Sequence, residues 1–335
     1  MPLRFRSVAT LAFCALSAAL PAALRAQTAP ATPDSAAVPT APAPALAPGD
    51  TLGRALLWRV DVPGAPAPSY LFGTIHLIHA ADFLLSDSLV AALNRSERVV
   101  FEIDPAEMQN PMVAMSLMQR AMMSDGQTLR DLLDDEQYGR VEAHFSAMGL
   151  PMMFLERVKP MFLAMLAGLD PSDMGGMMGG LGGDAEGGAS GIKSYEFELD
   201  AIAREADKEV GGLETADFQI GLFDSIPYPA QAEMLVAAID APAGADDELT
   251  RLTKVYVTGD VDGMYAMTVA EEGGLGGFER MLIVNRNRNW IAPMLEQSAA
   301  APTLFAVGAG HLGGPEGVVR LLRAEGATVT GVSVR

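Results

Sequence analysis

The two ends of this chain repeat one pattern, in which an apolar run is followed by Gly-x-x-His, a helix-forming stretch and a second β-rich run. The first copy reads "SYLFGTIH" up to His76, continues through a helical stretch at residues 86–94, and ends in "ERVVFEID" at Asp104. The second copy occupies residues 302–334 and contains "VGAGH", which ends at His311. A strand, a helix and a strand at this spacing predict a βαβ unit.

The sequence therefore predicts an α/β fold with two related βαβ-containing halves that form a central sheet flanked by helices. Residues 57–60, before the first copy, and residues 70–72, within it, are two β-rich runs around a Pro/Gly turn, which predicts a hairpin at the start of the sheet. A further strand is expected through Val210 to Leu213, after a helix that ends near Ala206.

Both histidines lie where a strand is expected to end. His76 follows Gly73 by three residues, and His311 follows Gly308 by three. Glycine lets the backbone turn sharply at such a point, and open α/β sheets bind ligands outside the carboxyl ends of their strands. The two histidines are therefore predicted to meet at one edge of the sheet, although they are far apart in the sequence.

Carboxylates end two other predicted strands, Glu102 in "VVFEID" and Glu214 in "GGLET". We expect His76, His311 and Glu102 to come together as metal ligands. Two histidines and a carboxylate suit a divalent metal such as Mn²⁺, Co²⁺ or Zn²⁺ and leave positions open for water. The alternative is that both histidines cap helices or form hydrogen bonds within the core.

The remaining candidate residues carry weaker signals. His79 forms an HxxH pair with His76, but the segment after the glycine need not be helical, so His79 is expected to be a bystander. His144 lies on an ordinary amphipathic helix, which favours a structural role. In "NRNRNW", Arg286 suits a substrate carboxylate or an active-site glutamate, because its guanidinium binds carboxylates in a bidentate way. A solvated helix face is an equally weighted alternative for this stretch.

The first 26 residues have the parts of a secretory signal: early arginines, an apolar core and small residues up to Ala26. Cleavage there predicts a periplasmic or secreted protein. No membrane span is expected after cleavage, because the apolar run of the signal falls short of the ~20 residues that a bilayer requires. Residues 27–50 read as an Ala/Pro-rich linker, and residues 51–335 as the folded domain.

Within this domain, residues 108–191 are expected to form a Met- and Gly-rich helical insertion and loop. Of the 20 methionines in the chain, 14 lie between Met108 and Met178, and many of them are at helical spacing. We expect these helices to line a groove or a mobile cover over the site, because methionine adapts to varied apolar partners. Ordinary core packing is the alternative.

Charge and cysteine content exclude several classes of function. Removal of three arginines with the signal changes the formal net charge from −19 to −22, which disfavours nucleic-acid binding. The only cysteine, Cys14, lies inside the signal, so the mature chain has no disulfide, thiolate metal site or cysteine nucleophile. The glycine turns lack the P-loop ending and the full dinucleotide fingerprint. The sequence does not indicate an oligomeric state.

Five blocks, "YLFGTIH", "VVFEID", "GGLET", "RNRNW" and "FAVGAGHLGGPEGVVRLL", occur in this order and resemble those of the TraB/GumN family. That family is related to the Tiki proteases and more distantly to erythromycin esterase-like and ChaN-like proteins. The resemblance covers most of residues 54–334, but the Met/Gly-rich stretch up to residue 191 does not align. It implies an α/β fold of two related halves and, for the Tiki branch, proteolysis that depends on a divalent metal. By motif position, it implies a centre built from His76, Glu102, Glu214, Arg286, Asn287 and His311.

Our first hypothesis is an exported metal-dependent hydrolase that acts on a peptide. In this hypothesis Glu102 or Glu214 handles the proton, and Arg286 orients the substrate or a carboxylate. The rival is a non-enzymatic protein that binds a peptide, haem or metal with the same residues. A third hypothesis is metal-free His/Glu hydrolysis of an ester. A peptide or another small molecule is the expected partner in the first case.

Overall fold

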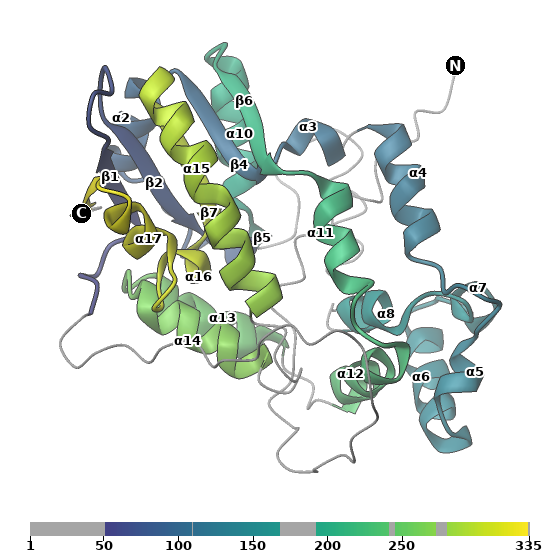
Figure 1. Cartoon of the computed structure of the whole chain (residues 1–335). Helices are drawn as coiled ribbons and strands as arrows, with labels where there is room; N and C mark the ends of the chain where they lie inside the picture. The colour runs from purple at the N-terminus through teal and green to yellow at the C-terminus, as the bar shows by residue number, and fades with distance from the viewer. Residues whose placement is uncertain (1–50, 109, 168–191, 241–244, 273–279, 334–335) are drawn as a thin grey trace.

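The computed structural model describes residues 51–108, 110–167, 192–240, 245–272 and 280–333. The predicted signal and linker therefore lie outside the described residues, as does the glycine-rich part of the predicted insertion. Within the described ranges the chain forms a mixed α/β fold with one large sheet and flanking helices (Figure 1).

Six strands form the large sheet in the order β6-β4-β7-β2-β1-β8. The neighbours from β6 to β2 are parallel, whereas β1 is antiparallel to both β2 and β8. The predicted hairpin is confirmed, because β1 and β2 pair from Leu57 opposite Phe72 to Val60 opposite Ser69. The strands of this sheet are β1 (Leu57–Asp61), β2 (Ser69–Thr74), β4 (Arg98–Ile103), β6 (Glu209–Glu214), β7 (Thr303–Gly308) and β8 (Thr328–Val332).

The two βαβ units interleave in this single sheet. The first unit runs from β2 through α2 (Asp87–Arg95) to β4, and β7 lies between its two strands. The second runs from β7 through α17 (Val318–Ala324) to β8, and β2 and β1 lie between its two strands. Ser86 caps α2 by accepting a hydrogen bond from the Leu89 N–H, which explains where this helix begins.

This interleaving makes β2 and β7 parallel neighbours, with Thr74 opposite Gly308. The two Gly-x-x-His motifs therefore leave the same edge of the sheet side by side, as the sequence predicts. The motif glycines are needed because a side chain at these positions would come too close to neighbouring atoms. An unusual backbone conformation is not the reason at Gly308, whose φ of −52° lies outside the left-handed region. A Cβ on Gly73 would lie 3.1 Å from the Cα of Ala309, and one on Gly308 would lie 3.2 Å from the Glu102 Oε1.

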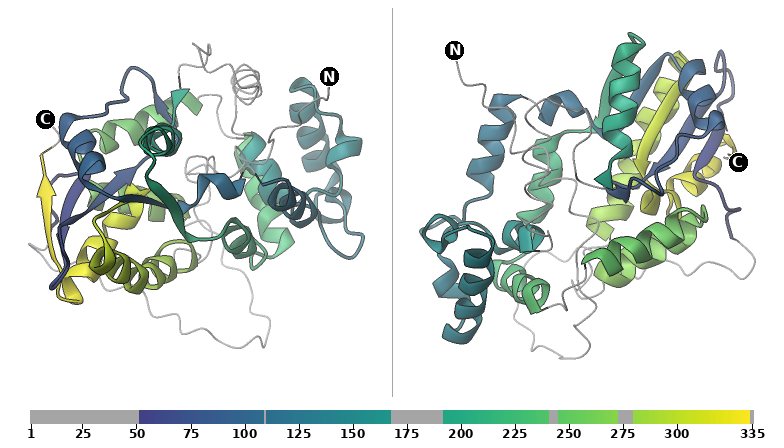
Figure 2. Two further views of the ribbon diagram at one scale, coloured as in Figure 1. Left: turned by 90° about the horizontal axis from the view of Figure 1, so that it is seen from above. Right: turned by 180° about the vertical axis from the view of Figure 1, so that it is seen from behind.

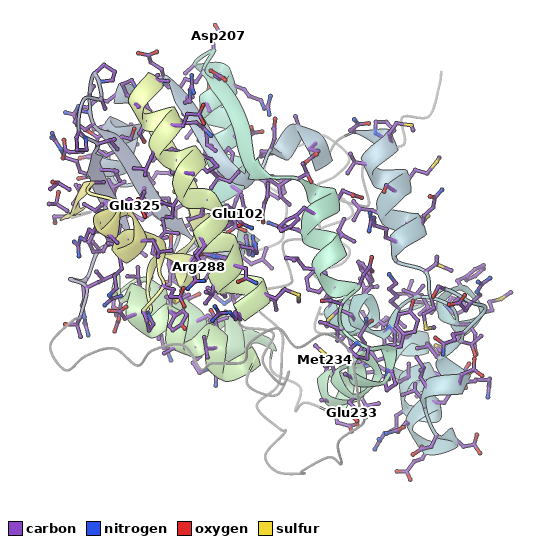
Figure 3. All side chains as sticks on the ribbon, viewed as in Figure 1. Glu102, Asp207, Glu233, Met234, Arg288 and Glu325 are labelled. Atoms are coloured by element: carbon purple, nitrogen blue, oxygen red, sulfur yellow. The ribbon has the colours of Figure 1, made fainter. Side chains whose placement is uncertain are left out.

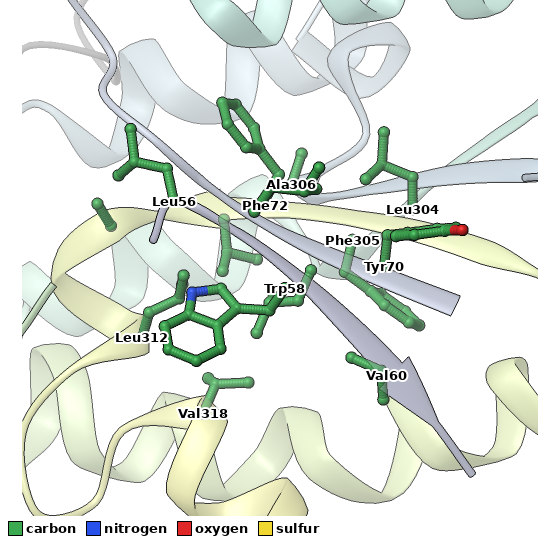
Figure 4. Close-up of a cluster of buried hydrophobic side chains, with 14 of the residues drawn as sticks. Leu56, Trp58, Val60, Tyr70, Phe72, Leu304, Phe305, Ala306, Leu312 and Val318 are labelled. Carbon is green, nitrogen blue, oxygen red and sulfur yellow. The ribbon is translucent and has the colours of Figure 1, made fainter. Parts of the chain in front are cut away.

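Helices cover both faces of the sheet. In Figure 1, α15 (Asn285–Ala300) lies across the front of the sheet, and α10 (Tyr195–Glu205) lies behind it. The central strands β2 and β7 are buried along almost their whole length, as expected for strands covered on both faces, whereas the edge strand β6 is not. All residues of β2 are buried, and Trp58, Phe72 and Phe305 contribute large side chains to this core (Figure 4).

Several further elements lie at the carboxyl edge of the sheet, near both histidines. The helix α16 (Ala309–Leu312) carries His311 and packs on β2 and on α14 (Val261–Glu272). A two-stranded sheet of β3 (Ile78–His79) and β5 (Ile192–Lys193) follows His76. The other elements here are α13 (Ala245–Tyr256) and a π-helical turn at Arg280–Val284 that leads into α15.

A separate helical region lies beside the sheet in Figures 1 and 2. The short helix α3 (Pro105–Met108) leads into it from β4. Its apolar core includes Met123, Phe145, Leu163 and Leu235, which confirms the predicted helical segment for the described residues. Two helices from beyond β6 also join this region. Its helices are α4 (Pro111–Arg120), α5 (Leu129–Leu132), α6 (Asp135–Ala147), α7 (Met152–Leu155), α8 (Pro160–Ala167), α11 (Ala216–Phe223) and α12 (Tyr228–Asp240).

The methionines of the helical region divide into two groups. Met123 and Met161 are buried, as ordinary core packing requires. Met112, Met115 and Met118 of α4 are more than half exposed. The segment is therefore a helical region with an exposed methionine surface. Among the described residues, no helix is both long and apolar enough to cross a membrane.

Candidate active site

Two glutamates and one arginine form the charged centre of the site. Glu102 near the end of β4 and Glu214 at the end of β6 lie on adjacent parallel strands. Arg286 extends from α15 and donates from Nη2 to the Glu102 Oε2 at 2.5 Å and to the Glu214 Oε1 at 2.6 Å. Its Nε donates to the same Glu214 oxygen at 2.9 Å. Arg286 is 8% exposed, so a solvated helix face is excluded for this residue.

Electrostatic attraction keeps Glu102 and Arg286 charged in spite of their burial. Burial raises the pKa of Glu102, but the Arg286 guanidinium and the two histidines outweigh it and hold this pKa well below its usual range. Burial lowers the pKa of Arg286, but Glu102 and Glu214 outweigh it and raise this pKa above its usual value. Figure 3 shows Glu102 on the side of the sheet that faces the helical region.

Asn287, the residue next to Arg286, fixes the tautomer of His311. Its Nδ2 donates to two backbone carbonyls, those of His311 at 3.2 Å and Glu316 at 2.8 Å. The Asn287 Oδ1 is therefore the atom that faces the His311 Nδ1, at 2.6 Å, and it can only accept a proton. His311 must carry its hydrogen on Nδ1, which leaves a lone pair on Nε2.

The His311 Nε2 points toward the charged centre. It lies 3.8 Å from the Glu102 Oε1 and 3.2 Å from the Arg286 Nη1, from which it accepts a hydrogen bond. The same Glu102 oxygen accepts a 2.8 Å hydrogen bond from the Gly308 N–H. Burial, together with the charges of Arg286 and His76, lowers the pKa of His311 to about 3, although Glu102 opposes the shift. His311 is therefore neutral at physiological pH.

His76 has the opposite electrostatic environment. Its Nδ1 lies 2.9 Å from the Glu196 Oε1, and the side chain is 20% exposed. Burial lowers the pKa of His76, but the charge and hydrogen bond of Glu196, with a smaller contribution from Glu102, raise it to about 9. Glu102 and Arg286 also contribute to the electrostatic environment of His76, and the pairing of Thr74 with Gly308 brings the two motifs to the same edge of the sheet.

Among the described residues, neither of the other candidate histidines has a side-chain hydrogen bond to this centre. His79 is in β3, where it pairs with Ile192, so the HxxH segment is not helical. His144 is on α6, and its ring packs edge-on against that of Phe145. Arg288, two residues after Arg286, is 51% exposed along its side chain and pairs with Glu316 (Figure 3).

Three further side chains contact the site without having been predicted from the sequence. Glu196 holds His76, and the Gln219 Nε2 donates to both Glu102 and Glu214. The Trp290 Nε1 donates to the Glu214 Oε2 at 3.0 Å, and its ring lies 4.6 Å from that of His311. Trp290 belongs to the "RNRNW" block, so that block contained a usable signal. Glu196 and Gln219 lie in no recognised motif.

The donor set fits a divalent metal in its chemistry. Two donors on one ion are separated by at most ~4.2 Å when each bond is ~2.1 Å, so the 3.8 Å between the His311 Nε2 and the Glu102 Oε1 is compatible. Both ring Nδ1 atoms have an acceptor, as is usual for metal-binding histidines. In the described ranges, however, no three His, Cys, Asp or Glu side chains already converge as a ligand group. The Arg286 guanidinium lies beside two of these donors.

Comparison with known proteins gives a family match. The profile of the TraB/PrgY/gumN family matches residues 56–331, which is most of the chain. The chain is 23% identical over 333 residues to Metalloprotease TIKI1 of Danio rerio, which covers 82% of this chain and 63% of that protein. It is 30% identical over 102 residues to Metalloprotease TIKI2 of Danio rerio, which covers 30% of this chain and 19% of that protein. The chain thus spans less than two-thirds of these relatives. No solved structure matches significantly.

Proposed function

The chain belongs to the TraB/PrgY/gumN family, and from this membership and the site geometry we infer that it is a metal-dependent hydrolase that cleaves peptides. Distant similarity to two proteins named metalloproteases supports both the metal and the peptide substrate. The proposal includes export to the periplasm or beyond, on the evidence of the signal-like residues 1–26.

One observation carries the proposal. The Nδ1 atoms of His76 and His311 are each held by an acceptor, at 2.9 Å and 2.6 Å, and both rings interact electrostatically with Glu102. Histidines that bind metals in proteins have this arrangement, because the second hydrogen bond fixes the ring and leaves Nε2 for the ion.

His76, His311 and Glu102 would hold the ion. When bound there, a divalent ion supplies Lewis-acid polarisation of a carbonyl and lowers the pKa of a coordinated water. The Gly308 N–H and Arg286 orient the Glu102 carboxylate by bonding different oxygens of it. Glu102 is the carboxylate nearest His311 and is our candidate to accept the proton of the attacking water if it is not itself a ligand.

Glu214 and Asn287 orient other side chains of the site. Both oxygens of Glu214 have donors: Arg286 and Gln219 on Oε1 and Trp290 on Oε2. Glu214 therefore holds Arg286, and we assign it an orienting role in place of proton transfer. Asn287 fixes the tautomer of His311. The N–H groups of Arg286 already donate to protein acceptors, so we assign it to orienting the two carboxylates.

A metal-free reaction is the second candidate, and one observation favours it. Arg286 donates to both Glu102 and His311, so the site is electrostatically compensated by the protein alone. In that reaction the neutral His311 Nε2 would accept the proton of an attacking water, and the water oxygen would add to the ester carbonyl and displace the alcohol, which takes up the proton.

Turnover of a peptide library by the purified mature chain distinguishes these functions. The account predicts cleavage with added Mn²⁺ or Co²⁺, abolished by a chelator and restored by the metal, and unchanged in His79→Ala. Cleavage that survives chelation would support the metal-free reaction. If no peptide is cleaved under any of these conditions, but the chain binds a peptide, haem or metal, it is a binding protein.

A further inference from the structure

Glu196, in the first turn of α10, holds its carboxylate against the end of β2. Its Oε1 accepts hydrogen bonds from the Thr74 Oγ1 at 2.6 Å and from His76 at 2.9 Å. Its Oε2 accepts a 2.8 Å bond from the Ser194 Oγ. Both oxygens are thus fixed, one by the residue before the helix and the other by a buried strand residue. The position of the carboxylate is set by the fold, independently of any ligand.

This carboxylate is retained at an electrostatic cost. The Glu196 side chain is only 16% exposed, and burial raises its pKa. The charge of His76 and the hydrogen bonds from His76, Thr74 and Ser194 outweigh burial, so the pKa of Glu196 lies below its usual value. The start of a helix also favours negative charge.

The hydrogen bond to Glu196 determines which His76 nitrogen is left for other partners. A carboxylate can only accept, so the His76 Nδ1 must carry a hydrogen, whether the ring is neutral or charged. We propose that Glu196 is a positioning residue, which holds the His76 ring through Nδ1 so that Nε2 is the nitrogen presented to the metal. That the ligand of Nε2 is a metal ion rests on the proposed function. The hydrogen bond between Nδ1 and the carboxylate is observed whatever the function is.

The inference also distinguishes the two halves of the site. His311 is held by an amide oxygen of Asn287, whereas His76 is held by a carboxylate. A carboxylate partner raises the basicity of a ligating imidazole more than a neutral partner does. His76 is therefore the stronger donor of the two. Loss of Glu196 should weaken metal binding without moving His311.

Nuclear magnetic resonance of metal-free protein labelled with ¹⁵N-histidine tests the positioning directly. Wild type should show a downfield, slowly exchanging Nδ1–H signal that His76→Ala removes. Glu196→Ala should abolish this signal, whereas Glu198→Gln should retain it. Glu198 is the matched control, because it lies on the same helix and pairs with Lys193. An unchanged His76 Nδ1–H signal in folded Glu196→Ala would overturn the inference.

Metal affinity supplies the second readout. The Kd for Mn²⁺, measured by titration calorimetry, should rise about 10–100-fold in Glu196→Ala, the range found for loss of such a hydrogen-bond partner. It should rise less in Glu196→Gln, which keeps an acceptor oxygen without the charge. If Glu196→Ala does not fold, the Gln variant decides: a shifted Nδ1–H signal with a weaker Kd supports the inference, and no change in either overturns it.

The two measurements separate this inference from the proposed function. If wild type binds no metal and cleaves no peptide, the proposed function fails, while loss of the signal in Glu196→Ala still supports the positioning of the ring. If wild type is a metal-dependent hydrolase and the signal persists without Glu196, the function stands and the positioning role is wrong.

Discussion

His76 and His311 each follow a motif glycine at the end of neighbouring parallel strands, but different groups pack against the two rings. Glu196 faces the Nδ1 of His76, and Asn287 faces that of His311. Burial lowers the pKa of both rings. The Glu196 charge outweighs burial and raises the pKa of His76 to about 9, whereas the pKa of His311 falls to about 3. The same local sequence pattern thus produces a cationic and a neutral imidazole.

The difference shows that the motif sets position and the surrounding helices set chemistry. Gly-x-x-His places each ring at the carboxyl edge of the sheet. The partner of each ring comes from another element, α10 for His76 and α15 for His311. Both rings would hold a divalent ion as neutral imidazoles, so binding would remove the charge difference between them. The predictions below test the contrast between the two histidines.

The largest effect is expected from removing either ring. His76→Ala and His311→Ala should each lower kcat/KM for a cleaved peptide by about 10²–10⁴-fold, because the ion that activates the water would lose a protein ligand. Steady-state kinetics with saturating Mn²⁺ measures this loss. If only one of the two variants loses activity, the prediction of a paired site is wrong and that histidine acts alone.

Arg286 should be the largest contributor to stability on the His311 side. Arg286→Met leaves Glu102 and Glu214 buried without their cation, which should lower the free energy of unfolding by about 3–5 kcal/mol. Arg288→Met is the control, because Arg288 is half exposed and its ion pair is worth at most about 1 kcal/mol. Urea denaturation of both variants gives the comparison. Equal losses would contradict the buried charge centre.

The pH dependence of metal-free stability should have opposite signs for the two rings. The folded pKa of His76 is raised to about 9, so its contribution is fully present below the unfolded value of about 6.5 and is lost as pH rises to 9. The folded pKa of His311 is lowered to about 3, so its contribution is present above about 6.5 and is lost as pH falls toward 3.

Urea denaturation between pH 4 and pH 9 measures both contributions. Relative to His76→Gln, wild type should lose stability above about pH 6.5. Relative to His311→Gln, it should lose stability below that pH. Parallel curves for wild type and His76→Gln would show that Glu196 does not hold a charged ring.

The smallest effect is expected from His79. It lies in the short strand β3, beside the site and outside its hydrogen bonds. His79→Ala should change the free energy of unfolding by no more than about 0.5 kcal/mol, as is usual away from buried networks, and should leave kcat/KM unchanged. A loss comparable to that of His76→Ala would make His79 a member of the site.

Much of the strand arrangement around the site followed from the sequence. The apolar runs, the glycines before His76 and His311, and the carboxylates that end β4 and β6 predicted which residues reach one edge. The interleaving of β7 between β2 and β4 did not follow, because pairing between strands far apart in the chain leaves no local pattern. The helix partners α11 and α12 of the Met-rich region were missed for the same reason.

Several features of the site could not be predicted from the sequence, and the reasons are again physical. Sequence could not decide between a solvated and a buried Arg286, because its neighbours on α15 are polar whichever face they occupy. Glu196 is 120 positions from His76, on an ordinary amphipathic helix, so nothing in its surroundings indicated a contact. The tautomer of His311 depends on the two carbonyls that orient Asn287, which only the folded chain brings together.

A Co²⁺ titration followed by visible absorption tests the central claim most directly. The metal-free chain should bind one equivalent and develop the ligand-field bands of a protein-bound ion. His76→Ala and His311→Ala should each lose these bands at the same Co²⁺ concentration, whereas His79→Ala should keep them. Retention of the full spectrum in both His76→Ala and His311→Ala would contradict a shared metal site built from the two Gly-x-x-His motifs.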